Sequence, residues 1–160
     1  MTAGGVVVTR TAEPIDEQML DTVCTQVEGL RGGVLSSGME YPGRYSRWHL
    51  AYVNPCAELV ARGRRIGARA LNARGEVLLP VLGAALLRVG EPVAAGRAAG
   101  EVEVVIPEPA GVRAEEDRSR RPTVFSAVRE VITAMAGEDP HLGLYGAFGY
   151  DLAFQFEPVE

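Results

Sequence analysis

Cysteine and histidine are scarce in this chain, which has two of each among its 160 residues. Cys24 and Cys56 are too few for a disulfide framework and lack metal-ligand spacing, so we expect two buried free thiols in a reducing cytoplasm. His49 and His141 have no serine, cysteine and acid around them in a catalytic pattern, and no two carboxylates stand out as a matched acid and base. The sequence therefore predicts neither a catalytic group nor a metal site within the chain.

Long apolar runs and an excess of positive charge are also missing. The longest apolar run, Val77 to Leu87, is interrupted by Pro80 and Gly83 and falls short of the roughly 18 residues that a membrane span needs. The N-terminus has no basic segment followed by an apolar one, so we expect no secretory signal. A net charge of −5 disfavours nucleic acid and anionic membranes as partners. We expect a cytoplasmic protein.

The composition that remains is that of a folded domain. Hydrophobic residues make up 47% of the chain and charged residues 23%, which is typical of globular proteins and not of disordered ones. Its length is sufficient for one domain, spanning residues 1–160, with its own core. The clearest internal linker is Pro107 to Pro122, which combines prolines with a run of mixed charge. We expect it to join two parts of this domain and to have a mobile tip.

Hydrophobic periodicity predicts helices and strands. One helix is expected from Pro14 to Gly29 and another from about Pro122 to Gly137, because apolar residues recur in both at helical spacing. A turn at residues 72–75 leads into residues 77–79, and a short helix is expected at 81–87. Strands are expected at residues 33–37, 49–54, 58–62, 65–71, 101–106 and 142–150, and residues 6–8 form either a strand or an ordered arm.

Two patterns that could suggest ligand binding have simpler structural interpretations. Residues 143–149 contain three glycines, but their spacing is wrong for a dinucleotide fingerprint and no helix pattern follows. Tight packing of a strand explains them better. Several arginines also cluster in one part of an acidic chain, and we expect them to form a solvated strand face instead of an anion site; they are Arg62, Arg64, Arg65, Arg69 and Arg74.

The stretch from Val34 to Trp48 is the best candidate for a functional segment. It combines serine hydroxyls, guanidiniums, phenols and an indole with the chain-breaking pair Pro42 and Gly43. Each of these polar groups would need its own partner inside a packed core. The mixture therefore favours a strand–loop–strand passage whose loop meets a polar, aromatic ligand, and a plain surface hairpin is the alternative.

The same stretch resembles a known family. Ser36–Trp48, followed by Asn54-Pro55, is similar to the N-terminal region of anthranilate synthase, in the bacterial form that fuses the synthase and the glutamine amidotransferase in one chain. Leu71–Glu76 and Gly143–Glu157 follow in the family's order. The resemblance covers the chain from about Leu30 onward. Three sequence blocks in the family's order make the match more specific than a single block would.

The resemblance implies a fold and a binding site. The family fold is a large β-sandwich with outer helices, so we expect an α+β chain with mainly antiparallel strands. A Leu-Leu-Glu-Ser segment of the family contributes to a pocket for tryptophan, the end product, and its last two positions match Ser36 and Ser37, where Ser36 replaces the acid. Arg47 falls where the family often has a basic residue. Tyr41 and Arg44 are further candidates, with Trp48, although all three could instead fix the loop by stacking and hydrogen bonds.

The resemblance also implies that the catalytic sites of the enzyme lie in other parts of it. In the family the chorismate site, with its Mg²⁺-binding glutamates, lies in the C-terminal part of the synthase, and the glutamine site lies in the amidotransferase. We expect both parts to be absent here, so this segment alone has no activity and no cofactor. Expected partners are tryptophan as inhibitor, the two missing parts and further copies in a homo-oligomer. The alternatives are part of an aminodeoxyisochorismate synthase, or a stand-alone module that binds aromatic amino acids.

Overall fold

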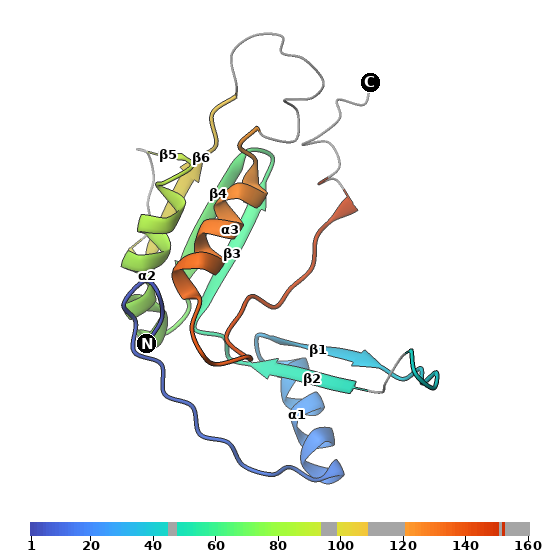
Figure 1. Cartoon of the computed structure of the whole chain (residues 1–160). Helices are drawn as coiled ribbons and strands as arrows, with labels where there is room; N and C mark the ends of the chain where they lie inside the picture. The colour runs from blue at the N-terminus through green and yellow to red at the C-terminus, as the bar shows by residue number, and fades with distance from the viewer. Residues whose placement is uncertain (45–47, 94–98, 109–120, 151, 153–160) are drawn as a thin grey trace. The chain divides into compact units, whose positions relative to one another are not determined.

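The computed structural model describes residues 1–44, 48–93, 99–108, 121–150 and 152, and within α1 it leaves the side chains of Glu17 and Leu20 undescribed. The chain divides into two compact units (Figure 1). The smaller unit comprises residues 9–55, and the larger one comprises residues 1–8 together with residues 56–160. Each unit has its own sheet, and the strands in both sheets pair antiparallel. The predicted α+β class with mainly antiparallel sheets is therefore confirmed.

The smaller unit consists of helix α1 (Glu17–Gly29) and a hairpin of strands β1 (Gly32–Ser37) and β2 (Trp48–Val53). The helix begins at Glu17 and not at Pro14, because the carboxylate of Asp16 accepts a hydrogen bond from the backbone N–H of Met19 at 2.8 Å and caps the first turn. Gly29 is the last helical residue, as predicted. Both strands agree with the sequence pattern to within one residue at each end.

The larger unit contains a four-stranded sheet in the order β3-β4-β6-β5. Strands β3 (Ala57–Arg62) and β4 (Arg65–Ala70) correspond to the strands predicted at residues 58–62 and 65–71, and they form a hairpin whose turn includes Gly63 at a φ of 55°. Strand β6 (Glu101–Val105) pairs with β4. The two-residue strand β5 (Glu91–Pro92) pairs with β6 where the sequence pattern indicates no strand. Ile66 and Ala68 alternate inward from β4 and are fully buried, whereas Arg65 and Arg69 on its other face are exposed, as predicted.

Helix α2 (Ala73–Leu86) corrects the prediction for this stretch. The sequence pattern predicted a turn at residues 72–75 and a helix only after Pro80, whereas one helix runs through both. The side-chain oxygen of Asn72 accepts hydrogen bonds from the N–H groups of Arg74 and Gly75 and starts the helix. Pro80 and Glu76 are both exposed, so the carbonyl left without an intrahelical donor lies on the wet side. Packing on the buried side outweighs the low helix propensity of proline.

Helix α3 (Val124–Met135) completes the larger unit and confirms the prediction for residues 122–137. The backbone N–H of Thr123 donates to the hydroxyl of Ser126 in a capping box at its start. Helices α2 and α3 both pack on the four-stranded sheet (Figure 1). The core between them is formed by Ile66, Ala68, Leu82, Ala85, Leu86, Val104, Ile106, Val124, Ala127, Val131 and Ala134.

The N-terminal arm is ordered but is not a strand. The backbone N–H groups of Ala3 and Gly4 donate to the carbonyls of Ala136 and Ala134 at 2.8 and 2.7 Å, at the end of α3. A Cβ atom on Gly4 would come within 2.9 Å of the carbonyl oxygen of Ala134, so the close approach needs glycine here. Of the two interpretations left open for residues 6–8, the ordered arm is the one observed.

The predicted strand at residues 142–150 is wrong. These residues carry an alternating apolar pattern but belong to no strand, because none of the described strands pairs with them. Phe148 is 72% exposed, and its ring lies near that of Phe125, with the ring centroids 5.4 Å apart. Tyr150 is 90% exposed. The apolar run at residues 154–159 and residues 109–120 of the predicted linker lie outside the described residues.

Candidate functional site

The hairpin of the smaller unit holds most of the residues that the sequence singled out. Strands β1 and β2 pair in a register that places Ser36 opposite His49 and Ser37 opposite Trp48. The pair Ser37–Trp48 is the last described pair of this ladder, and Tyr41 and Arg44 follow β1 in the chain. Because successive side chains of a strand point to opposite faces, Ser36 and Ser37 present their hydroxyls on different sides of the hairpin.

Two contacts confirm this alternation. The hydroxyl of Ser36 shares a hydrogen bond with Nδ1 of His49 at 2.9 Å. On the other side, a Cβ atom built on Gly33 would meet the ring of its cross-strand partner Tyr52 at 2.9 Å. We call the first side the Ser36 face (Gly32, Val34, Ser36, His49, Ala51 and Val53) and the second the Ser37 face (Gly33, Leu35, Ser37, Trp48, Leu50 and Tyr52).

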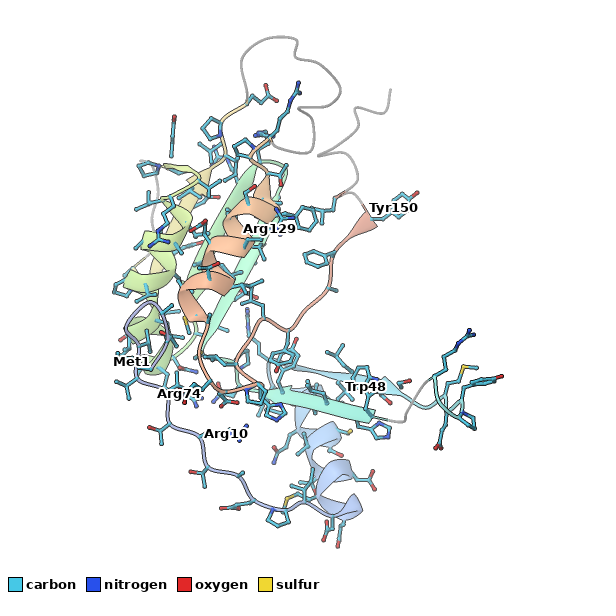
Figure 2. All side chains as sticks on the ribbon, in the orientation of Figure 1. Met1, Arg10, Trp48, Arg74, Arg129 and Tyr150 are labelled. Atoms are coloured by element: carbon cyan, nitrogen blue, oxygen red, sulfur yellow. The ribbon has the colours of Figure 1, made fainter. Side chains whose placement is uncertain are left out.

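The Ser37 face combines apolar surface with the hydroxyls of Ser37 and Tyr52. Trp48 is 50% exposed and Leu35 is 37% exposed, while Ser37 between them is half-buried. Figure 2 shows Trp48 at the start of β2. An exposed indole directly opposite a serine offers a stacking surface for an aromatic ring beside a partner for an ammonium or a carboxylate.

The loop after β1 contains the other predicted site residues. The backbone N–H of Arg44 donates to the carbonyl of Tyr41 at 2.9 Å, and Gly43 between them has a φ of 75°, which glycine adopts without strain. The side chains of Tyr41 and Arg44 are exposed. Arg47 lies outside the described residues. The structure therefore brings Tyr41 and Arg44 together in one turn and leaves their ligand contacts as a prediction.

His49 is the residue of this hairpin that sequence reasoning did not assign to the site. No catalytic pattern of residues surrounds it in the sequence. Its bond to Ser36 depends on the strand register, since the two residues are 13 positions apart and become neighbours only in the ladder. A hairpin whose turn is centred on Pro42 and Gly43 aligns Ser36 with His49. The two strands predicted from the sequence therefore already implied this pairing.

Most of the arginine cluster lies in the β3–β4 hairpin of the larger unit, but Arg74 lies in α2 and not on a strand face as predicted. Arg69 pairs with Glu58 at 2.6 Å and Arg65 with Glu103 at 3.4 Å, both on the solvent side of neighbouring strands, as expected for a solvated strand face. Arg64 differs from them. Its guanidinium donates to the backbone carbonyls of Ile106, Pro107 and Pro122, so it joins segments far apart in the sequence.

Few described groups suit metal or catalytic chemistry. Within the described ranges no group of three or more histidine, cysteine or acidic residues could hold a metal ion. Cys24 and Cys56 are both free thiols, as predicted, although they are half-buried and not fully buried. Among the helices that the structure describes, none is long and apolar enough to cross a membrane.

Comparison with known proteins identifies a relative of known name. The chain is 48% identical over 160 residues, 99% of its length, to a protein of Azospirillum brasilense named anthranilate synthase. It spans 22% of the length of that relative. No protein-family model matches the chain. The resemblance drawn from the sequence is thus confirmed, and the chain is a homologue of part of an anthranilate synthase.

Proposed function

We propose that this chain is a non-catalytic part of an anthranilate synthase, and that it contributes the site through which tryptophan inhibits the enzyme. The similarity of 48% over 99% of the chain to a protein named anthranilate synthase is the observation that carries the proposal. At this level of identity over nearly the whole chain, a shared fold and role are the simplest explanation. The reaction of the parent enzyme is then the conversion of chorismate, with glutamine or ammonia, to anthranilate and pyruvate.

The proposed tryptophan site lies on the Ser37 face and the adjoining loop. Trp48 and Leu35 supply apolar surface for the indole, and the Ser37 hydroxyl supplies a hydrogen-bond partner for the polar end of the ligand. Arg44, in the turn after β1, and Arg47 are candidates for the carboxylate, since guanidinium groups bind carboxylates well. Tyr41 in the same turn adds a second aromatic ring. Ser36 contributes to this site through its backbone, because its side chain is on the opposite face.

Inhibition requires that tryptophan distinguish two arrangements of the enzyme. A ligand shifts such an equilibrium only by the difference between its affinities for the two states. A site on a two-stranded hairpin suits this role, because such a hairpin is only marginally stable by itself. The inhibited state is then the one that binds tryptophan more tightly.

The remaining expected partners belong to the same proposal. Chorismate chemistry and its Mg²⁺ ion, and the release of ammonia from glutamine, are assigned to other parts of the parent enzyme. The exposed apolar side chains at Leu144, Phe148 and Tyr150 support contact with further protein, whether those parts or a second copy of the chain. Figure 2 shows Tyr150 projecting away from the helices of its unit.

The proposal is tested in the complete synthase that contains this chain. Ser37→Phe should weaken inhibition by tryptophan at least tenfold and leave anthranilate formation in place, because the larger side chain occupies the space next to Trp48. Anthranilate fluorescence measured against tryptophan concentration gives the inhibition constant. Thr25→Phe is the matched control: it adds the same ring at an exposed hydroxyl of α1 in the same unit and should leave inhibition unchanged.

Two results would contradict the proposal. The first is unchanged inhibition in Ser37→Phe, which would remove the hairpin from the site. The second is anthranilate formation from chorismate and ammonia by the 160-residue chain alone, which would show that the catalytic groups are present in it.

A further inference from the structure

One described hydrogen bond between side chains links the two strands at the loop end of the β1–β2 hairpin. The last described pair of the ladder is Ser37–Trp48, and the pair before it is Ser36–His49, whose side chains share the hydrogen bond of 2.9 Å. Both side chains of this bond are exposed. The bond therefore joins the two strands one pair away from Ser37 and Trp48.

The sheet of the smaller unit is narrow. Its described part has two strands, so β1 and β2 pair with each other and with no third described strand. An isolated two-stranded hairpin is marginally stable in water. The cross-strand link at Ser36–His49 stabilises the ladder next to the pair Ser37–Trp48, because cross-strand pairs act locally.

We propose that His49 is a positioning residue for the tryptophan site: by holding Ser36 across the ladder, it keeps Ser37 opposite Trp48. This inference rests on the proposed function. His49 is on the Ser36 face and does not touch a ligand on the Ser37 face. It acts on the fraction of molecules in which the last ladder pair is formed, and the apparent affinity of a ligand falls in proportion to that fraction.

The size of the effect follows from the strength of the link. Loss of one exposed hydrogen bond changes an opening equilibrium on the order of two- to tenfold. When the open form becomes the major one, the inhibition constant for tryptophan rises by the same order. A steric block such as Ser37→Phe acts on the ligand contact itself and has a larger effect.

The experiment compares replacements of His49 in the complete synthase that contains this chain. His49→Leu removes the bond to Ser36, whereas His49→Asn places an amide group near the position of Nδ1 and can restore it. We expect the tryptophan inhibition constant to rise two- to tenfold in His49→Leu and to return to within twofold of the wild type in His49→Asn. His141→Leu, which removes the other histidine of the chain, should leave the constant unchanged.

Two further readouts separate positioning from general loss of structure. Ser36→Ala should raise the inhibition constant as much as His49→Leu, and the double variant should raise it no further, because both remove the same bond. Hydrogen exchange of the backbone amides of Ser37 and Trp48 should accelerate in both single variants. Amides within α1 should exchange as in the wild type.

The outcomes distinguish this inference from the proposed function. If tryptophan does not inhibit the wild-type enzyme, the proposed function fails, and the inference fails with it. If tryptophan inhibits the wild type and His49→Leu equally, the proposed function stands and the inference is overturned. Equal defects in His49→Leu and His49→Asn would also overturn it, because the hydrogen bond would then not be the cause.

Discussion

Arg64 provides the sharpest test of how the larger unit is held together. It follows Gly63 in the β3–β4 turn, and its Nε donates to the carbonyl of Ile106 at 2.9 Å while its Nη2 donates to the carbonyl of Pro122 at 3.0 Å and to that of Pro107. The backbone N–H of Ile106 in turn donates to the carbonyl of Arg64 at 2.8 Å. One side chain thus joins the turn, the end of β6 and the residue before the capping Thr123 of α3.

The cost of removing this guanidinium can be estimated from its bonds. Hydrogen bonds to charged groups contribute roughly 1.5–3 kcal/mol each when they are well formed, and less when they are exposed. Only the bond to Ile106 is partly buried, and those to the two prolines are exposed. We therefore expect Arg64→Met, which keeps the aliphatic stem, to lower the free energy of unfolding by about 3 kcal/mol. For a chain of this size that corresponds to a fall in Tm of roughly 6–12 °C.

Chemical denaturation of the two purified proteins, followed by circular dichroism, measures this change. Arg65→Met is the matched control, because Arg65 is the next residue but makes an ion pair at 3.4 Å whose arginine side chain is 58% exposed. Its loss should lower stability by less than about 1 kcal/mol. The reasoning is refuted if the two variants lose the same stability, or if Arg64→Met loses less than about 1 kcal/mol.

Two further predictions concern packing and association. Gly75→Ala should destabilise the chain by at least about 2 kcal/mol in the same denaturation assay, because a Cβ atom there would overlap the carbonyl oxygen of Cys56; Gly143→Ala, which would meet nothing within 4 Å, should change stability by less than about 0.5 kcal/mol. Replacing Leu144 and Tyr150 together by serine should reduce self-association of the isolated chain in light scattering, whereas Val77→Ser, at an exposed apolar residue of α2, should not. Equal behaviour of the two glycine variants, or a monodisperse wild-type monomer, would contradict these expectations.

Local patterns predicted most of the regular structure. The hairpin β3–β4 follows from the alternation of apolar and polar residues on both sides of a glycine turn, and α3 follows from helical spacing after a capping threonine. The pattern failed at α2, because Pro80 is normally a boundary and only the packing of the buried side keeps the helix continuous. It also failed at residues 142–150, because alternation indicates a strand but does not supply a neighbouring strand to pair with.

The candidate site, like the fold, was predicted in part from local sequence patterns. The sequence located a strand–loop–strand passage and named Ser36, Ser37 and the loop residues as a group. The strand register then separated the two serines onto opposite faces and brought His49 to Ser36, 13 positions away. Ser36 and Ser37 are adjacent in the sequence but lie on different faces of the hairpin, whereas Ser36 and His49 are distant in the sequence but share a hydrogen bond.

By itself the sequence determined what depends on short-range order: the helix and hairpin signals, the relationship to anthranilate synthase and the free cysteines. These properties reside in residue type and spacing over a few positions. The tertiary structure alone decided that Arg64 meets both ends of a long connection and that one helix continues through Pro80. Such contacts depend on the balance of packing and hydrogen bonding over the whole unit, and no local pattern contains that balance.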